Sequence, residues 1–114
     1  MTKEEIVKKI KYGLELSSEL PDLEFKTARQ NVPNDIWRTI SAFANRKGGG
    51  LVVFGVSQES NSVVGCQNLD LMQTKLTEYF NNKMSFVLRP EYHVIEYENK
   101  TILAVYIPEC PKDY

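Results

Sequence analysis

Three segments of the chain place apolar residues at helical spacing, with polar residues between them. The first spans about residues 4–18 and the third about residues 68–82. The second follows Asn34 and Asp35, which are residue types that favour helix N-caps. Its apolar stripe consists of Ile36, Ile40, Phe43 and Ala44. The spacing therefore predicts three helices, the second of them about three turns long.

Strand patterns lie between and after these helices. Residues 23–26 alternate apolar and charged side chains, so Glu24 and Lys26 should share the face opposite the core. Residues 51–56 form a continuous apolar run, typical of a strand covered on both faces, and a brief return strand or bend follows. Residues 92–107 predict a β-hairpin. The order α-β-α-β-(β)-α-β-β indicates an α+β, or mixed α/β, fold with helices packed on a mixed sheet.

The composition is that of an ordinary globular protein. Of 114 residues, 42% are hydrophobic and 25% charged, which predicts a single domain over residues 1–114. The two cysteines lack the spacing of a zinc site. The longest apolar run, from Ile102 to Ile107, is too short to span a membrane, and no export signal is present. We therefore expect a cytoplasmic protein with reduced thiols and no membrane partner.

Positive charge is concentrated in one segment, although the formal net charge is −1. Residues 26–47 contain five Lys or Arg and one Asp. The segment leads into a cation-glycine run made of Arg46, Lys47, Gly48, Gly49 and Gly50. Glycine permits positive φ and leaves backbone amides bare, so amides beside two cations suit an anion. The alternative interpretation is a helix C-cap and a tight connection.

Cations in this segment are candidates for contact with a nucleic-acid backbone, because phosphate contacts need positive charge without base-reading geometry. The candidate residues are Lys26, Arg29, Arg46 and Lys47, assisted by the amides of the three glycines. The alternative is an ordinary solvated rim. Trp37 falls at helical spacing and is expected in the core. His93 has no predicted carboxylate or thiol partner and is expected to be structural.

Two glutamates are candidates for a metal site. Glu19 and Glu24 flank and enter the first strand. Converging carboxylates can hold a divalent cation, and such a cation can polarise a phosphodiester and activate water. The alternative is that each is solvated or paired with a neighbouring Lys or Arg.

Four motifs follow one another along the chain: Glu19-Leu-Pro-Asp-Leu-Glu24-Phe-Lys26, Ile40-Ser-Ala-Phe-Ala-Asn45, Gly48-Gly49 and Leu51-Val-Val-Phe-Gly-Val56. In this order they resemble the Schlafen-like AlbA domain family, over roughly residues 12–111. The resemblance implies a DNA-binding domain at the front of a bacterial transcription regulator. An older description of the family, as divergent AAA ATPases, implies ATP binding. The chain contains no Gly-Lys-Ser/Thr sequence, so a P-loop is not predicted.

Animal relatives in that family include RNA-cleaving enzymes with two glutamates, an aspartate and a divalent metal. The resemblance implies Glu19 and Glu24 as the two glutamates and magnesium or manganese as the cofactor. The third acid is expected just after the Gly-Val strand, where this chain has Ser57 and Gln58, with Glu59 next. The missing acid favours a module without catalysis or cofactor over a nuclease.

Three functional hypotheses therefore stand. The leading one is a nucleic-acid-binding module, DNA-directed, that contacts phosphates without sequence specificity. The second is a metal-dependent ribonuclease that uses Glu19 and Glu24. The third is a nucleotide-sensing or protein-interaction domain. Family members continue beyond the last predicted strand, so we expect an excised N-terminal module, with homo-oligomerisation through this or further domains.

Overall fold

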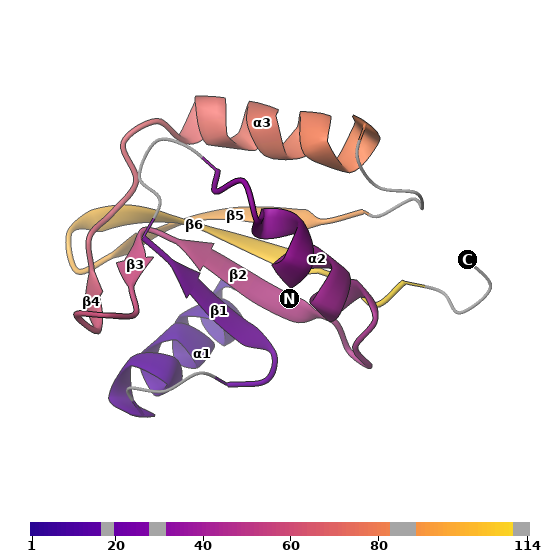
Figure 1. The fold of residues 1–114 in the computed structure, drawn as a ribbon. Coiled ribbons are helices and arrows are strands. Elements are labelled where there is room, and N and C mark those ends of the chain that lie inside the picture. Colours follow the sequence, from indigo (N-terminus) through magenta and orange to yellow (C-terminus); the bar gives the residue numbers. More distant parts are fainter. Residues whose placement is uncertain (17–19, 28–31, 83–88, 111–114) are drawn as a thin grey trace.

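A four-stranded mixed sheet with helices on both faces forms the centre of the fold (Figure 1). The computed structural model describes residues 1–16, 20–27, 32–82 and 89–110. The helices within them are α1 (Lys3–Leu16), α2 (Ile36–Ala44) and α3 (Leu69–Asn82). The sheet, in the order β1-β2-β6-β5, contains β1 (Leu23–Lys26), β2 (Gly50–Phe54), β5 (Glu91–Tyr97) and β6 (Lys100–Ile107). Strand β1 runs parallel to β2 and the other pairs are antiparallel, which confirms the predicted α+β fold with a mixed sheet.

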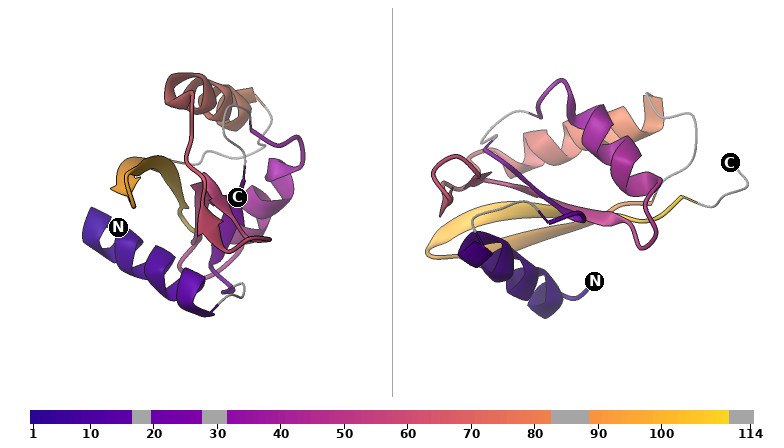
Figure 2. Two further views of the ribbon diagram at one scale, coloured as in Figure 1. Left: turned by 90° about the vertical axis from the view of Figure 1, so that its left-hand side faces the viewer. Right: turned by 60° about the horizontal axis from the view of Figure 1, so that its bottom comes forward.

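The molecule has three layers, with α2 and α3 on one face of the sheet and α1 on the other (Figures 1 and 2). The hydrophobic core splits accordingly into two clusters. Residues Val52 and Phe54 of β2 pack toward α2 and α3, whereas Leu51 and Val53 pack toward α1. Every residue of β2 is buried, which confirms the predicted strand covered on both faces.

The continuous strand predicted over residues 51–56 is interrupted at Gly55. This residue has φ +101°, and a Cβ atom there would lie 3.0 Å from the Cys66 sulfur. The chain therefore leaves the main sheet after Phe54 and forms a separate two-stranded sheet. Its strands are β3 (Val56–Ser57) and β4 (Ser62–Val63). The brief return strand predicted from the sequence is thus one half of a hairpin.

The other predicted elements lie close to their expected positions. In α3, the Asn68 side chain accepts a hydrogen bond from the Leu71 amide at 3.2 Å, as expected of an N-cap. The β5–β6 hairpin turns through Glu98 and Asn99, both at positive φ, which suits a tight two-residue turn. Helix α1 begins with reciprocal hydrogen bonds between Thr2 and Glu5.

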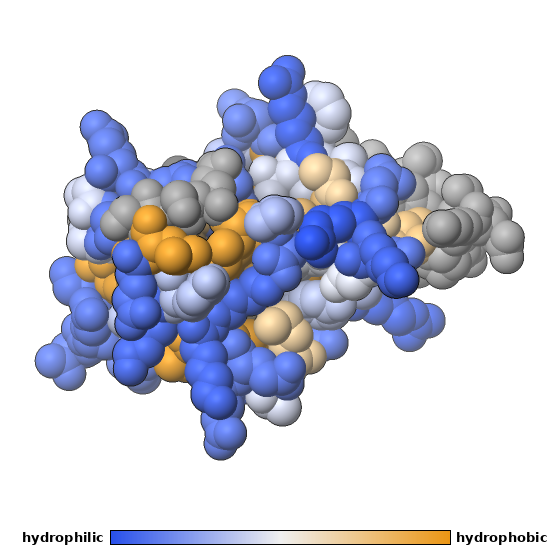
Figure 3. All heavy atoms as spheres, turned by 90° about the horizontal axis from the view of Figure 1, so that it is seen from below, coloured by the Kyte–Doolittle hydropathy of each residue, from blue (hydrophilic) through white to orange (hydrophobic). Residues whose placement is uncertain are grey.

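Helix α1 covers its face of the sheet as an amphipathic surface helix. Its buried side consists of Ile6, Ile10 and Gly13. The side seen from below is mainly hydrophilic, with an apolar patch beside the grey atoms (Figure 3). None of the helices in the described residues combines the length and apolar character needed to cross a bilayer.

Candidate functional site

In the glycine turn between α2 and β2, the backbone amides of Gly48 and Gly49 already have hydrogen-bond acceptors within the protein. The Gly49 amide donates to the Arg46 carbonyl oxygen at 2.9 Å, and the Gly48 amide donates to Glu109 Oε1 at 3.1 Å. Gly50 is buried as the first residue of β2. The prediction that the glycine amides are bare is therefore wrong for Gly48 and Gly49, because a carbonyl and a carboxylate already accept their hydrogen bonds.

Close packing, rather than ligand access, explains two of the three glycines. At Gly49 (φ +73°) a Cβ atom would collide with the Ile107 carbonyl oxygen. At Gly50 it would collide with the Phe43 ring of α2. Gly48 (φ +85°) has no atom within 4 Å of the same position. The C-cap and tight-connection alternative describes this turn better than an open anion site.

The side chain of Arg46 folds over the turn. Its Nη1 donates to the carbonyl oxygens of Lys47, at 3.1 Å, and of Gly49, at 3.3 Å. A guanidinium group has five N–H donors, so these two hydrogen bonds fix its position without using all of them. Lys47 is exposed. Both cations therefore lie at the surface, directly after the last turn of α2.

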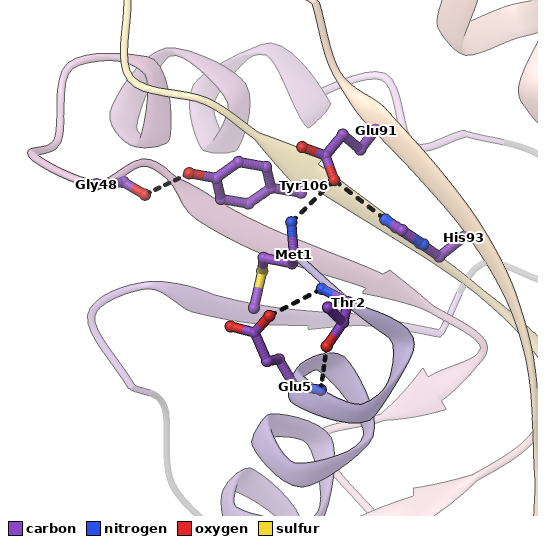
Figure 4. A network of polar contacts seen from close by, with 7 residues as sticks. All are labelled: Met1, Thr2, Glu5, Gly48, Glu91, His93 and Tyr106. Atoms are coloured by element: carbon purple, nitrogen blue, oxygen red, sulfur yellow. Dashed lines mark hydrogen bonds and ion pairs between the residues drawn. The ribbon is translucent and has the colours of Figure 1, made fainter.

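A residue of β6 contacts the turn, and a polar network of β5 and the N-terminal residue lies beside it (Figure 4). The Tyr106 hydroxyl donates to the Gly48 carbonyl oxygen at 2.8 Å. Nearby, Glu91 Oε1 lies 3.0 Å from the Met1 ammonium and 3.3 Å from His93 Nε2. The hydrogen bond from the Met1 ammonium lowers the pKa of Glu91 below its ordinary value, with a smaller contribution from His93. His93 thus has the carboxylate partner that the sequence analysis missed, two residues away on the same strand face.

A hollow of about 150 Å³ lies beside the glycine turn. Its lining includes the ion pair between Lys9 and Asp22, together with Gly48, Gly50 and Tyr106. Pockets for drug-sized ligands usually measure about 300 Å³ or more. The hollow is therefore too small to enclose a nucleotide, and the two charges in it neutralise each other.

Glu24 and Lys26 form an ion pair on β1, the edge strand of the sheet. Their Oε1 and Nζ atoms are 3.4 Å apart, and the two side chains are 24% and 20% exposed. Their partners in β2, Val52 and Phe54, both belong to the core under α2 and α3. The prediction that the two side chains share a face is therefore confirmed, but the prediction that this face lies opposite the core is wrong, because both faces of the sheet carry core residues. The predicted phosphate contact of Lys26 has to compete with Glu24.

The predicted cations do not gather in one place. In the strand register, Lys26 of β1 lies opposite Phe54, the last residue of β2. Arg46 and Lys47, in contrast, precede Gly50, the first residue of β2. At about 3.3 Å per residue, the length of β2 separates the two groups by roughly 13 Å. Lys26 and the pair Arg46 and Lys47 therefore lie at opposite ends of β2, because β1 runs parallel to β2 and the two strands end together. Arg29 lies outside the described residues.

The described residues include only one of the two glutamates of the predicted metal site, so that site stays a prediction. They contain no group of three or more His, Cys, Asp or Glu side chains that could hold a metal ion. Glu24 is paired with Lys26, and Glu19 lies outside the described residues. Ser57, at the position of the third acid, is buried and accepts a hydrogen bond from the Ser60 amide at 3.2 Å. Glu59 is exposed in the turn after β3. The nuclease hypothesis remains a prediction.

Helix α2 carries a surface that the sequence analysis did not select. Trp37 is 48% exposed, so its predicted place in the core is wrong. The Arg38 guanidinium carbon lies over its ring, 5.2 Å from the ring centroid. Arg38 belongs to the cationic segment of residues 26–47 but is not among the four predicted phosphate contacts. Trp37 is turned by about 100° from the buried Ile36, at the border of the apolar stripe, so helical phase alone does not give a signal that finds the pair.

Comparisons with known proteins agree with this architecture. The family model described as Schlafen, AlbA_2 matches residues 19–114. The N-terminal domain of a RecG-related protein from Nitrosomonas europaea has a similar structure, with TM-score 0.71 and 24% identity, over 93% of this chain and 74% of that one. The DIP2311 protein from Corynebacterium diphtheriae aligns with TM-score 0.58 and 14% identity, over 95% of this chain and 26% of that one. No curated protein matches the chain.

Proposed function

The chain belongs to the Schlafen, AlbA_2 family, and we propose that it is a nucleic-acid-binding module whose contact surface follows α2. The family is nucleic-acid related, which supports a nucleic acid as the partner. A preference for DNA, and a place in a transcription regulator of the bacterial cytoplasm, are the finer parts of the proposal. The structurally similar domain from Nitrosomonas europaea is the N-terminal domain of a RecG-related protein, which is compatible with this proposal.

One observation carries the proposal: cations stand at both ends of α2 and no acid stands between them. Arg38 lies in the first turn, while Arg46 and Lys47 follow the last. The sequence contains no Asp or Glu from residue 36 to residue 58. A helix of nine residues is about 13 Å long, so these charges can contact successive parts of one phosphate backbone.

The carboxylates around this surface set limits on the affinity. Glu109 already accepts the Gly48 amide, and Glu24 already pairs with Lys26. Three phosphate contacts by Arg38, Arg46 and Lys47 give a log–log salt slope of about −2 to −3. Binding that depends on such contacts is sequence-tolerant, with a dissociation constant on the order of 10⁻⁵ M at physiological salt.

Fluorescence anisotropy with labelled oligonucleotides tests this proposal. The protein is titrated against one sequence as duplex DNA, single-stranded DNA and RNA, at several salt concentrations between 50 and 200 mM. The double variant R46Q/K47Q should flatten the salt slope by about 1.4 to 1.8. The matched control K8Q/K11Q removes the same charge from exposed positions of α1, on the opposite face of the sheet, and should leave the slope unchanged.

Two results would contradict the proposal. One is the absence of binding to all three oligonucleotides at 50 mM salt. The other is an equal loss of affinity in both double variants, because net charge alone would then explain the binding. Circular dichroism confirms that each variant is folded before its affinity is compared.

A further inference from the structure

Trp37 is the single tryptophan of the chain and lies outside the core. Helix α2 buries Ile36 and Ile40 against the sheet, and Trp37 projects to one side of that stripe. An indole is among the largest apolar groups that a protein can bury. Here 48% of the residue stays exposed, so the helix presents part of this aromatic surface to solvent.

Arg38 lies over one face of this indole instead of pairing with a carboxylate. Its guanidinium carbon is 5.2 Å from the ring centroid, within the range of about 6 Å for a cation–π contact. Consecutive residues of a helix do not face each other, so the Arg38 side chain has folded back over its neighbour. Within the described part of the chain it forms no ion pair, and its charge remains available to an anion.

The combination of a planar aromatic group and a free cation defines the chemistry of the partner. We propose that Trp37 and Arg38 bind one unpaired nucleotide of a single-stranded nucleic acid, with its base against the indole and its phosphate near Arg38. This inference rests on the proposed function, because the strand would continue along α2 toward Arg46 and Lys47. Bases stack on aromatic side chains whatever their identity, so the contact does not need a particular sequence.

The same site discriminates against a duplex. Bases in a double helix are already stacked and paired, and a side chain on the outer surface of a helix does not reach their faces without unstacking them. Phosphate contacts by Arg46 and Lys47 are common to both forms. Single-stranded DNA or RNA should therefore bind more tightly than duplex DNA, and the difference should depend on Trp37.

Intrinsic fluorescence reports on the site directly, because no other tryptophan contributes to the emission. Excitation at 295 nm is combined with titration by oligothymidylate, oligouridylate and a duplex DNA of the same length. Stacking should quench the Trp37 emission in a saturable way with both single strands. The duplex should quench it much less, even at concentrations where anisotropy shows that it is bound.

Variants separate stacking from charge. Trp37→Ala should weaken single-strand binding by about 5- to 100-fold, the range of one base–aromatic stack, while duplex binding stays within about twofold. Trp37→Phe should recover part of the loss, since it keeps a smaller aromatic ring. Arg38→Lys keeps the charge but loses the planar group, and should lie between the parent and Arg38→Gln. Because Trp37 is half exposed, these variants should melt within a few degrees of the parent protein.

Each outcome bears on one proposal or the other. Equal binding of duplex and single strands, with no quenching and no effect of Trp37→Ala, would overturn the nucleotide site and leave the phosphate-binding surface intact. No binding by any oligonucleotide would overturn the proposed function as well. Quenching by a poly-glutamate peptide and not by oligonucleotides would replace the nucleotide with an acidic protein segment and refute the inference.

Discussion

The two ends of α2 differ in whether the groups that could bind a ligand are already occupied by other parts of the protein. At its C-terminal end, the glycine turn has its amides bound by Arg46 and Glu109 and its Gly48 carbonyl bound by Tyr106. At its N-terminal end, Trp37 and Arg38 contact each other and stay exposed. The glycine run is the most conspicuous feature of the sequence, yet the fold uses much of it for packing. A conspicuous sequence motif therefore does not by itself indicate a surface that is free to bind a ligand.

The largest expected effect concerns the packing role of the turn. Gly49→Ala should destabilise the protein by about 2–5 kcal/mol, because it adds left-handed strain and a collision with the Ile107 carbonyl oxygen. Gly48→Ala is the matched control, with the strain but no collision, and should cost about 1–2 kcal/mol. Urea denaturation measures both. Equal losses would show that the close approach to β6 does not constrain the turn.

A smaller effect is expected from removing the carboxylate that occupies the turn. Glu109→Gln eliminates a negative charge beside the Gly48 amide and should raise the affinity for nucleic acid by about 2–5-fold at low salt. Glu98→Gln, at the β5–β6 turn, removes the same charge at the other end of β6 and should have little effect. Anisotropy at 50 and 200 mM salt measures the change. An equal gain in both variants would assign the effect to net charge.

The ion pair on β1 offers a weaker test, at the far end of β2. Glu24→Gln should free Lys26 and change nucleic-acid affinity by less than about twofold, because a partly exposed ion pair contributes about 0–1 kcal/mol. The same variant tests the nuclease hypothesis. Structured RNA is incubated with manganese or magnesium and analysed by gel. Metal-dependent cleavage by the parent protein that disappears in Glu24→Gln would establish a catalytic role instead of the binding role proposed here.

The smallest effect is expected at the start of α1, where Thr2 and Glu5 form a capping box. At the start of α2, in contrast, Asp35 makes no side-chain cap hydrogen bond. The hydrogen bond from the Thr2 amide lowers the pKa of Glu5 below its ordinary 4.5. A carboxyl whose pKa is lowered by folding stabilises the folded state above its unfolded pKa and loses that contribution as pH falls through the folded value. Glu5→Gln should therefore be less stable than the parent protein at pH 7.

Thermal melts of the parent, Glu5→Gln and the neighbouring control Glu4→Gln follow this difference from pH 7 to pH 2. The gap between the parent and Glu5→Gln should close at the acid end. A constant gap over the whole range would mean that the charge of Glu5 does not contribute to the cap.

Elements with a strong local pattern were predictable from the sequence. The α2 stripe, the doubly covered β2 run and the hairpin each depend on the spacing of apolar residues within one segment. The interruption at Gly55 was not predicted, since the side chains that leave no room for a Cβ atom there belong to Cys66 and Ile102, outside the apolar run. Local pattern does not contain such contacts between distant segments.

The candidate site was less predictable, for the same physical reason. The acceptor of the Gly48 amide is Glu109, which is 61 positions away in the chain. The separation of Lys26 from Arg46 follows from the parallel register of β1 and β2, which no charge count contains. Trp37 borders the buried stripe of α2, and spacing alone does not decide on which side of that border it falls.

The central claim is that α2 is the surface that nucleic acid contacts. Amide NMR spectra of the labelled protein, titrated with a short single-stranded DNA and its duplex, test it most directly. We expect shifts at residues 36–38 and 46–48 with the single strand, shifts mainly at residues 46–48 with the duplex, and none along α1. Shifts that cluster on α1, or that spread evenly over the molecule, would contradict it.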